Sequence, residues 1–355
     1  MVDHVPGTQH ELIKAEKFAS TSVALLQREL ILPSLFWRWS AMDFKGAKDD
    51  TINVKVPGTL NARDRALRAT GEDRRIQMDF LKERTMGVRL DKFPYSATAI
   101  TDEQMDLDVE NFASQILKPQ VDAVARYVNK LAVDHLNSVV YADGRLSDDR
   151  ETFEDKTKIK GNLKAEDFYG PGKRGMASLF NRVRSTLIKR GVNQAQVYVA
   201  IGADFEEVLL DEMELLFADK AGDNTALRDA TIGKLRGFNF VSVPEIKGNE
   251  AHVFTPQSFV LATAAPSIPA GAVTGATQNA NGVALRWLRD YNADYAEDRS
   301  IVDCYAGTGT INDIAMADGT EAFIRGVKIT MDVDKVMAGR AAAEGTAAPT
   351  SGAAG

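Results

Sequence analysis

The sequence predicts an α+β protein in which one long amphipathic helix supports several strands. Within Thr101–Ala142, apolar residues recur every three or four positions, which is the spacing of the buried face of a helix. Thr51–Pro57 alternates apolar and polar residues, and Gln196–Ile201 is a short apolar run, as strands are. A second amphipathic helix, Ala177–Arg190, lies between further strand patterns. This mixture favours an α+β or α/β chain over an all-helical one.

The long helical segment contains Pro119, so it is either one kinked helix or two helices. Its start has the spacing of a capping box, with Thr101 three residues before Gln104. A proline inside a helix kinks it, whereas in the first turn its fixed φ and missing N–H are harmless. We therefore favour a long helix that begins at Pro119. Its polar face carries Arg126, Lys130 and Asp134.

Composition limits the classes of function. The chain has 355 residues, of which 44% are hydrophobic and 26% charged, enough for two or three globular domains or subdomains. Its one cysteine, Cys304, cannot form an intrachain disulfide, which suits a reducing compartment. The net charge of −7 argues against a general nucleic-acid binder. No apolar run approaches the roughly 18 residues of a membrane span, and the N-terminus lacks signal-peptide features, so we expect a protein made in a cytoplasm and held by no membrane.

A long two-stranded hairpin is predicted before the helix. Thr51–Pro57 is one strand, and Arg75–Leu81 is its partner, continuing through Gly87–Leu90. Between them, Gly58–Arg74 is rich in charges of both signs and has little to bury. Since an isolated hairpin is marginal in water, we expect this one to lie on another part of the protein or on a neighbour. Mixed charges favour protein contacts or a solvated loop over nucleic acid.

The first 48 residues resemble an arm more than a domain. Helical periodicity runs from Glu11 to Leu30, and four aromatic residues follow: Phe36, Trp37, Trp39 and Phe44. So short a segment cannot bury its own apolar side chains, which must rest on the main body or on a neighbouring chain. The alternative is an ordinary first helix packed against its own chain.

Four later segments complete the prediction. Asp143–Gly175 is a polar boundary, and Asp204 is expected to cap a helix over Phe205–Phe217. Thr263–Gly282 is expected to be a surface loop without periodicity, and the Ala- and Gly-rich tail from about Ala338 to be disordered.

Residues that carry chemistry are sparse. The four histidines are scattered, so no metal site is predicted, and His135 on the apolar stripe is expected to be a core or interface residue. Gly307-Thr308-Gly309-Thr310 with Asp313 has glycines like a phosphate-binding loop but lacks its Lys-Ser/Thr ending, so a tight turn between two strands is favoured. There is no Gly-x-Ser-x-Gly or His-Glu-x-x-His motif. We expect no catalytic, cofactor or metal site.

Three stretches in this order resemble one family. Gly46–Pro57 (GAKDDTINVKVP) opens the hairpin, Arg89–Gln104 (RLDKFPYSATAITDEQ) leads into the helix, and Leu227–Pro244 (LRDATIGKLRGFNFVSVP) is similar to a strand pair with a Gly-Phe step. Together they resemble tailed-bacteriophage major capsid proteins of the Hong Kong 97-like fold, in the branch of short-tailed-phage coat proteins. The resemblance covers roughly residues 20–333, almost the whole chain.

The resemblance implies a division of the chain. Residues 1–48 would be an N-terminal arm, 49–95 an extended hairpin called the E-loop, and 96–194 a P-domain built on the spine helix. Residues 195–285 would form the A-domain, 286–337 would complete the P-domain sheet, and 338–355 would be a disordered tail. It also implies a short helix from Asp102 to about Leu117 before the spine helix. The candidate inter-subunit contacts are Trp37, Trp39, Arg63, Arg65, Arg68, Glu72, Asp73 and Arg74.

The implied function is that of a structural protein, not an enzyme. Such a major capsid protein self-assembles into hexamers and pentamers of an icosahedral shell that encloses double-stranded DNA, with no cofactor. Its implied partners are further copies of itself, a separate scaffolding protein, a portal and non-specifically contacted DNA, with a decoration protein left open. It would be assembled in the host cytoplasm and located in the virion capsid.

Two other functions stay open at this point. An encapsulin-like bacterial compartment would use the same fold to enclose enzymes instead of DNA. A cytoplasmic nucleotide-binding enzyme would use the turn from Gly307 to Asp313.

Overall fold

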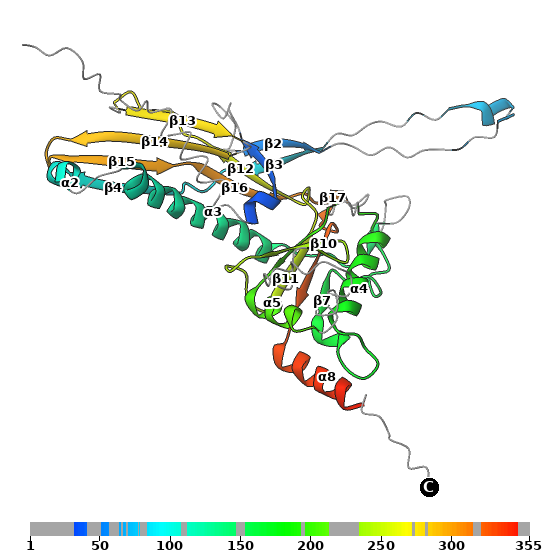
Figure 1. Ribbon diagram of the computed structural model, residues 1–355. Helices are drawn as coiled ribbons and strands as arrows, with labels where there is room; N and C mark the ends of the chain where they lie inside the picture. Colours follow the sequence, from blue (N-terminus) through cyan, green and yellow to red (C-terminus); the bar gives the residue numbers. More distant parts are fainter. Residues whose placement is uncertain are drawn as a thin grey trace, which may run out of the picture.

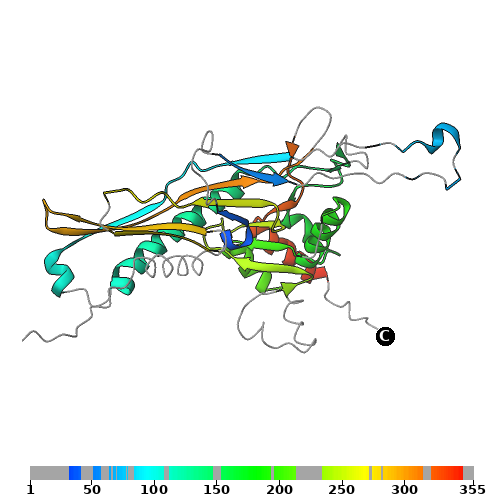
Figure 2. The same cartoon turned by 90° about the horizontal axis from the view of Figure 1, so that it is seen from above.

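The computed structural model describes residues 32–40, 51–56, 64, 67–68, 70–76, 78, 84–107, 112–146, 153–192, 196–212, 234–271, 274–280, 283–314 and 321–346. It has an elongated lobe, in which α3 (Lys118–Ser138) runs along a long sheet, and a compact lobe, in which helices cover a second sheet (Figure 1). A thin hairpin projects away from both lobes, on the side opposite α2 (Asp102–Leu107), in both views (Figures 1 and 2). The predicted α+β class is confirmed.

The main sheet of the elongated lobe has four antiparallel strands. The strand order β13-β14-β15-β4 comprises Thr274–Ala280, Val283–Asn292, Glu297–Asp303 and Tyr95–Thr101. A smaller sheet, β1-β12-β16, comprises Trp37–Ser40, Phe259–Ala264 and Tyr305–Thr310. The predicted apolar stripe of α3 faces these sheets, since Val121, Val124 and Val128 lie in the same buried cluster as Trp287 and Val302. The polar face with Arg126, Lys130 and Asp134 is exposed.

The start of the helical segment is partly as predicted. The capping box is present: the Thr101 N–H donates to Gln104 Oε1 and the Gln104 N–H donates to Thr101 Oγ1, each over 3.4 Å. The expected single helix from Asp102 to about Leu117 is wrong, because α2 ends at Leu107 and Ala113–Leu117 is a π-helical turn that runs directly into α3. Pro119 lies in the first turn of α3, as favoured. The wider π turn relieves the clash of a proline ring with the carbonyl four residues earlier.

A buried polar network fixes α3 against the sheet. Gln120 Nε2 donates to the carbonyl of Ser300 over 2.8 Å, and Ser300 Oγ donates to Gln120 Oε1 over 2.8 Å. The indole N–H of Trp287 donates to the same Ser300 hydroxyl over 3.1 Å. Because a buried polar group that loses its partner costs free energy, this network opposes sliding of the helix along the sheet.

The compact lobe contains a six-stranded sheet. Its order is β7-β19-β11-β8-β10-β9, comprising Asn162–Lys164, Gly326–Thr330, Glu250–Phe254, Tyr198–Ile201, Phe238–Ser242 and Lys234–Leu235. One face packs against α4 (Met176–Lys189), α5 (Ala203–Leu210) and α8 (Val333–Thr346), with Phe180, Phe205 and Val336 in one cluster. The other face, with Ala200 and Phe254, packs into the cluster that contains the α3 stripe.

The remaining described elements are short. Two pairs of short strands are β5 (Arg145–Leu146) with β6 (Phe153–Glu154) and β17 (Asp313–Ile314) with β18 (Glu321–Ala322). The short helices are η1 (Leu32–Leu35), η3 (Gly71–Arg74) and η5 (Ala165–Phe168).

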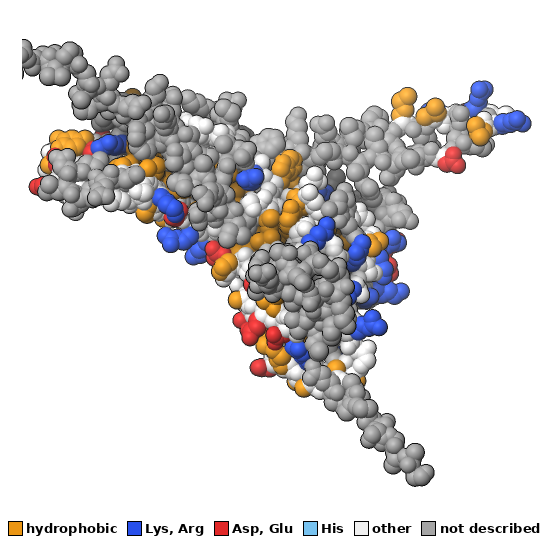
Figure 3. Space-filling model, viewed as in Figure 1, with side chains coloured by type: hydrophobic (Ala, Val, Ile, Leu, Met, Phe, Trp, Pro, Cys, Tyr) orange, Lys and Arg blue, Asp and Glu red, His pale blue; other side chains and the backbone are white. Residues whose placement is uncertain are grey.

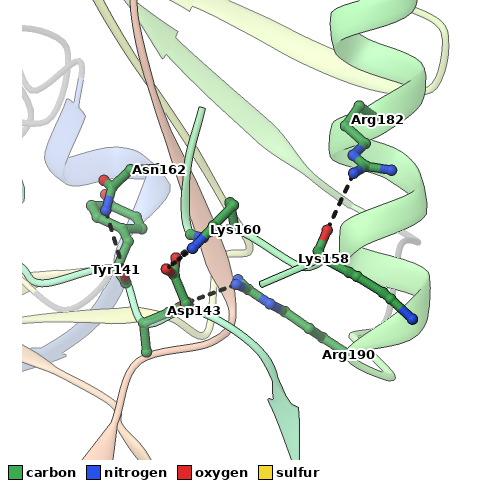
Figure 4. A network of polar contacts seen from close by, with 9 residues as sticks. Tyr141, Asp143, Lys158, Lys160, Asn162, Arg182 and Arg190 are labelled. Atoms are coloured by element: carbon green, nitrogen blue, oxygen red, sulfur yellow. Dashed lines mark hydrogen bonds and ion pairs between the residues drawn. The ribbon is translucent and has the colours of Figure 1, made fainter. Parts of the chain in front are cut away.

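One buried arginine ties α4 to the segment that leaves α3. The Arg190 guanidinium donates to the carbonyls of Ala142, Gly144, Ile324 and Gly326 over 2.7 to 3.1 Å. Burial lowers the pKa of Arg190 to about 10, so the side chain stays charged at neutral pH. Asp143, between two of these carbonyls, accepts from the Gly161 N–H and from Lys160 Nζ, each over 2.8 Å (Figure 4).

Several predicted segments differ in the structure. α4 closely matches the predicted Ala177–Arg190 helix, and Gly191 follows it with a φ of 68°. The helix expected over Phe205–Phe217 is α5, which ends at Leu210 and has Gly202, not Asp204, at its N-cap; residues 213–220 lie outside the described residues.

Two segments of small residues are regular elements after all. The expected loop Thr263–Gly282 contains β13, where a Cβ on Gly275 would lie 2.7 Å from Leu288 Cδ2, so small residues allow close packing on β14. Residues 338–346, expected to be part of a disordered tail, are helical in α8, since alanine is the strongest helix former. Residues 347–355 lie outside the description.

The two lobes cross the predicted domain boundaries, which stay a prediction. α4 lies in the compact lobe although it falls within 96–194, and β13 lies in the elongated lobe although it falls within 195–285. Residues 1–31 of the predicted arm are not among those described.

The glycine-rich segment from Gly307 to Thr310 is a strand, so the predicted tight turn is wrong. The hairpin strand β3 (Arg84–Arg89) crosses it so closely that a Cβ on Gly307 would lie 2.1 Å from the Arg89 carbonyl oxygen. A Cβ on Gly309 would lie 3.0 Å from Val88 Cγ2. The glycines therefore bring the hairpin base against β16, and the backbone of β3 fills the space that a phosphate would need.

We predict that Gly307→Ala destabilises the protein. The added methyl meets a backbone oxygen that cannot move without moving β3, and overpacking of this kind costs about 1–3 kcal/mol or more. Gly271→Ala is the control, because no atom lies within 4 Å of its Cβ position. Thermal unfolding followed by circular dichroism measures both, and equal midpoints for the two variants would contradict the proposed crowding.

His135 connects the end of α3 to β16, as expected for a core residue. Its Nε2 lies 2.8 Å from Thr310 Oγ1, and its ring stands edge-on to Phe259 with 5.8 Å between centroids. Burial is the main cause that lowers the pKa of His135 from 6.5 to about 4.

This shift predicts a pH dependence of stability. Because the unfolded state binds the proton more tightly, the contribution of His135 is complete above about pH 6.5 and is lost as the pH falls towards 4, by up to about 3 kcal/mol. His135→Gln can retain a hydrogen bond to Thr310 but does not titrate. The difference between the urea unfolding free energies of the wild type and this variant should change from pH 7 to pH 4. A difference that stays constant would show that His135 does not titrate on unfolding.

Candidate assembly surfaces

The projecting hairpin begins with β2 (Thr51–Val56) paired to β3, with Thr51 opposite Arg89 and Val56 opposite Arg84. The predicted partner strand is partly confirmed. Its continuation is right, since Gly87, Val88 and Arg89 pair with Asn53, Ile52 and Thr51. Its first part, Arg75–Leu81, is wrong where it is described: Arg74 ends the short helix η3, and Arg75, Ile76 and Met78 are not in a strand. Alternation of apolar residues is present in both segments, and the crossing of β3 over β16 selects the second. The arm is therefore paired at its base.

The tip of this arm exposes large apolar side chains. Leu67 is 101% exposed, Met78 86% and Ile76 75%. The exposed arginines Arg68 and Arg75 lie next to them in the sequence, and orange and blue side chains share the tip in Figure 3. Apolar groups gathered on a projecting arm are a feature of protein interaction sites, because water around them is released on contact.

The predicted contact residues fall into three groups. Arg68, Glu72 and Arg74 are exposed at the tip, as a contact role requires. Arg63 and Arg65 are not among the described residues, and the side chains of Asp73 and Trp39 are not described either.

The aromatic residues before the hairpin pack on their own chain where they are described. Phe36 is buried with its ring centroid 5.1 Å from Phe259, and Trp37 is half-buried against the cluster of Val88, Val260 and Ile311. β1 pairs in parallel with β12. This supports the alternative of packing in cis for these residues.

The sequence reasoning missed an exposed aromatic group at the base of the arm. The Phe93 ring lies 5.2 Å from Tyr305 and 6.1 Å from Tyr95, and Tyr95 is 67% exposed. The sequence Phe93-Pro94-Tyr95 at the end of the hairpin was the available signal. Aromatic side chains in such positions are enriched in protein interfaces.

The described residues offer little for catalysis. Within the described ranges, no three His, Cys, Asp or Glu side chains are grouped to hold a metal. A pocket of about 520 Å³ beside Arg190 and Arg325 contains guanidiniums already engaged, since Arg325 donates to Asp313 over 2.9 Å. Burial raises the pKa of Cys304 to about 12, so its thiol stays protonated. Among the helices of the described part, none is long and apolar enough to cross a membrane.

Comparison with known proteins finds likeness only in solved structures. No family model matches the chain, and no curated protein sequence matches it. The capsid of cyanophage P-SCSP1u is similar at 11% identity over 93% of this chain and 93% of that one, with a TM-score of 0.55. The capsid of a native GTA particle is similar at 11% identity over 85% and 90%, with a TM-score of 0.53. The mature capsid of bacteriophage PhiM1 is similar at 10% identity over 84% and 86%, with a TM-score of 0.52.

These likenesses extend over most of each chain, so they concern the whole architecture and not one motif. The long helix along an antiparallel sheet, the compact lobe and the projecting hairpin are the parts that the sequence resemblance led us to expect. The chain has the Hong Kong 97-like fold of phage capsid proteins.

Proposed function

We propose that the chain is the major capsid protein of a tailed bacteriophage, of the short-tailed-phage coat branch. As such a protein, the chain self-assembles into the hexamers and pentamers of an icosahedral shell that encloses double-stranded DNA. The observation that carries the proposal is the fold, shared over most of the chain with phage capsids. The role is structural, not enzymatic, and the protein is located in the virion capsid.

The projecting arm supports a role in assembly. Leu67, Ile76 and Met78 are exposed in the single chain, and a contact with a neighbouring copy would bury them. The arm corresponds to the E-loop, and its tip arginines pair with acidic residues of the neighbour. Trp37, Trp39, Glu72 and Asp73 remain candidates for the same contacts.

The two lobes correspond to the domains that the resemblance implies, with amended boundaries. The elongated lobe, with α3 as the spine, is the P-domain, and the compact lobe is the A-domain. α4 then belongs to the A-domain, and β13 and β14 belong to the P-domain sheet.

The remaining partners follow from this function. A separate scaffolding protein and a portal guide assembly in the host cytoplasm, and the packaged DNA is contacted without sequence specificity. The net charge of −7 is consistent with a shell that binds DNA weakly.

Negative-stain electron microscopy of the expressed chain, alone and with the scaffolding protein of its genome, tests the proposal. We expect closed shells, and particles from infected cells should contain nuclease-resistant DNA. Neighbouring genes for a terminase and a portal would agree with this. Shells that instead enclose a protein cargo would favour the encapsulin-like alternative, and a chain that stays monomeric under all conditions would reject both.

A second prediction concerns the apolar tip. Ile76→Asp with Met78→Asp should abolish shell formation and leave the fold intact, because both side chains are exposed in the single chain. Val140→Asp is the control, since Val140 is 80% exposed but lies on the body. Sedimentation and circular dichroism measure assembly and fold.

The same study should include Arg63→Glu, Arg65→Glu and Arg68→Glu together, which should lower the yield of shells. Unchanged yields for this variant and for the apolar-tip variant would mean that the tip is not a contact.

A further inference from the structure

Opposite ends of the compact-lobe strands carry opposite charges. We define the basic face as Lys158, Arg182, Arg184, Lys189 and Arg236, and the acidic face as Asp204, Glu207, Asp211 and Glu245, all of them exposed. Blue side chains gather over α4 and red ones over α5, on opposite sides of the lobe (Figures 1 and 3).

The two helices that carry these faces, α4 and α5, lie at opposite ends of strand β10. Arg236, in the turn before β10, accepts a hydrogen bond from Arg184 of α4 at its carbonyl over 3.2 Å. Ser242, the last residue of β10, donates to Glu206 of α5 over 2.6 Å. The two helices therefore contact opposite ends of the same strand.

The basic face has the composition of an interface. Arg182 donates to the Lys158 carbonyl and Arg184 to the Arg236 carbonyl, so both guanidiniums bind main-chain oxygens that carry no full charge. In the described residues, no ion pair joins Arg182, Arg184 or Lys189 to an acid. Ile188, on the same helix, is 58% exposed. An exposed apolar residue with charges around it is the pattern of an interface centre with a polar rim.

The acidic face is only partly compensated by ion pairs among the described residues. Of its four carboxylates, Asp211 has Arg340 at 3.8 Å, and the described ion pairs include none for Asp204, Glu207 or Glu245. Lys247 is exposed and close to Glu245 in the sequence, but its amine lies 3.5 Å from Glu250.

We propose that the two faces bind each other between neighbouring copies, so that the basic face of one chain lies on the acidic face of the next. A two-fold contact would place each face on an identical face and bring like charges together. Two different complementary faces instead give a head-to-tail contact, which closes into a ring when the rotation permits. This inference rests on the proposed shell function and assigns the contact that builds its rings.

Reversal of either face should abolish ring formation. The basic-face variant changes Lys158, Arg182, Arg184 and Lys189 to Glu, which leaves four negative charges and one positive charge on that face. The acidic-face variant changes Asp204, Glu207 and Glu245 to Lys, which leaves three positive charges and one negative charge. Each places like charges across the contact, and we expect association at least about tenfold weaker than that of the wild type. Circular dichroism shows whether each variant is folded. Arg126→Glu with Lys130→Glu, a charge reversal on the exposed face of α3, is the control and should assemble as the wild type does.

A mixture of the two variants gives a sharper result. Each variant then has two faces of one sign, and neighbours fit only when the variants alternate around the ring. Alternation is possible in a ring of six and impossible in a ring of five. Electron microscopy of the mixture should therefore show six-membered rings, as sheets or tubes, without closed shells. The variant with all seven substitutions should form closed shells again, because the charges of both faces are exchanged.

The outcomes separate this inference from the proposed function. Wild-type shells together with normal assembly of both single-face variants would overturn the ring contact and leave the shell function standing. Folded single-face variants that are rescued neither by mixing them nor by combining their substitutions in one chain would also overturn it. A wild type that forms no shell would reject the proposed function itself.

Discussion

The structure depends on how α3 packs along its sheet. Burial of its apolar stripe, with Val121, Val124 and Val128, stabilises this packing. The Gln120 amide fixes the position of the helix along the sheet, because its hydrogen bonds to Ser300 form at only one position. Once the helix is fixed, Arg190 binds the segment that leaves it to the compact lobe through four carbonyls. A buried guanidinium with all these acceptors holds a rigid joint, since any movement would leave a charge without partners.

The hairpin is held in a different way from the lobes. Its base lies against β16 because Gly307 and Gly309 have no side chains to keep β3 away. Beyond the base, the described residues Leu67 and Met78 expose their side chains to water. In the proposed assembly a neighbouring copy covers these side chains, which links the stability of the tip to association.

The sequence predicted features that lie within one helix or strand. It did not predict which segments pair or pack with each other. The capping box at Thr101 and helix α4 depend on neighbours a few residues away, so local spacing predicts them. The predicted partner of β2 was right from Gly87 onwards and wrong at Arg75–Met78, because both segments alternate and only the crossing at Gly307 distinguishes them. The same crossing requires the glycines of β16, and these glycines made that strand look like a turn in the sequence. β13 was missed because its small residues reflect the packing of Leu288, which the sequence does not reveal.

The two kinds of contact proposed here differ in what they can contribute. Charged faces such as those of α4 and α5 act over a distance of about 10 Å at about 0.1 M salt, so they orient neighbours before they touch, but exposed ion pairs add little affinity. The apolar tip of the arm acts only on contact and releases water when it is buried. Rings that form through weak, oriented contacts can dissociate and correct their size. The arm then locks a neighbour that is already in the right place. A shell needs both properties, because five- and six-membered rings must be selected reversibly before the structure becomes stable.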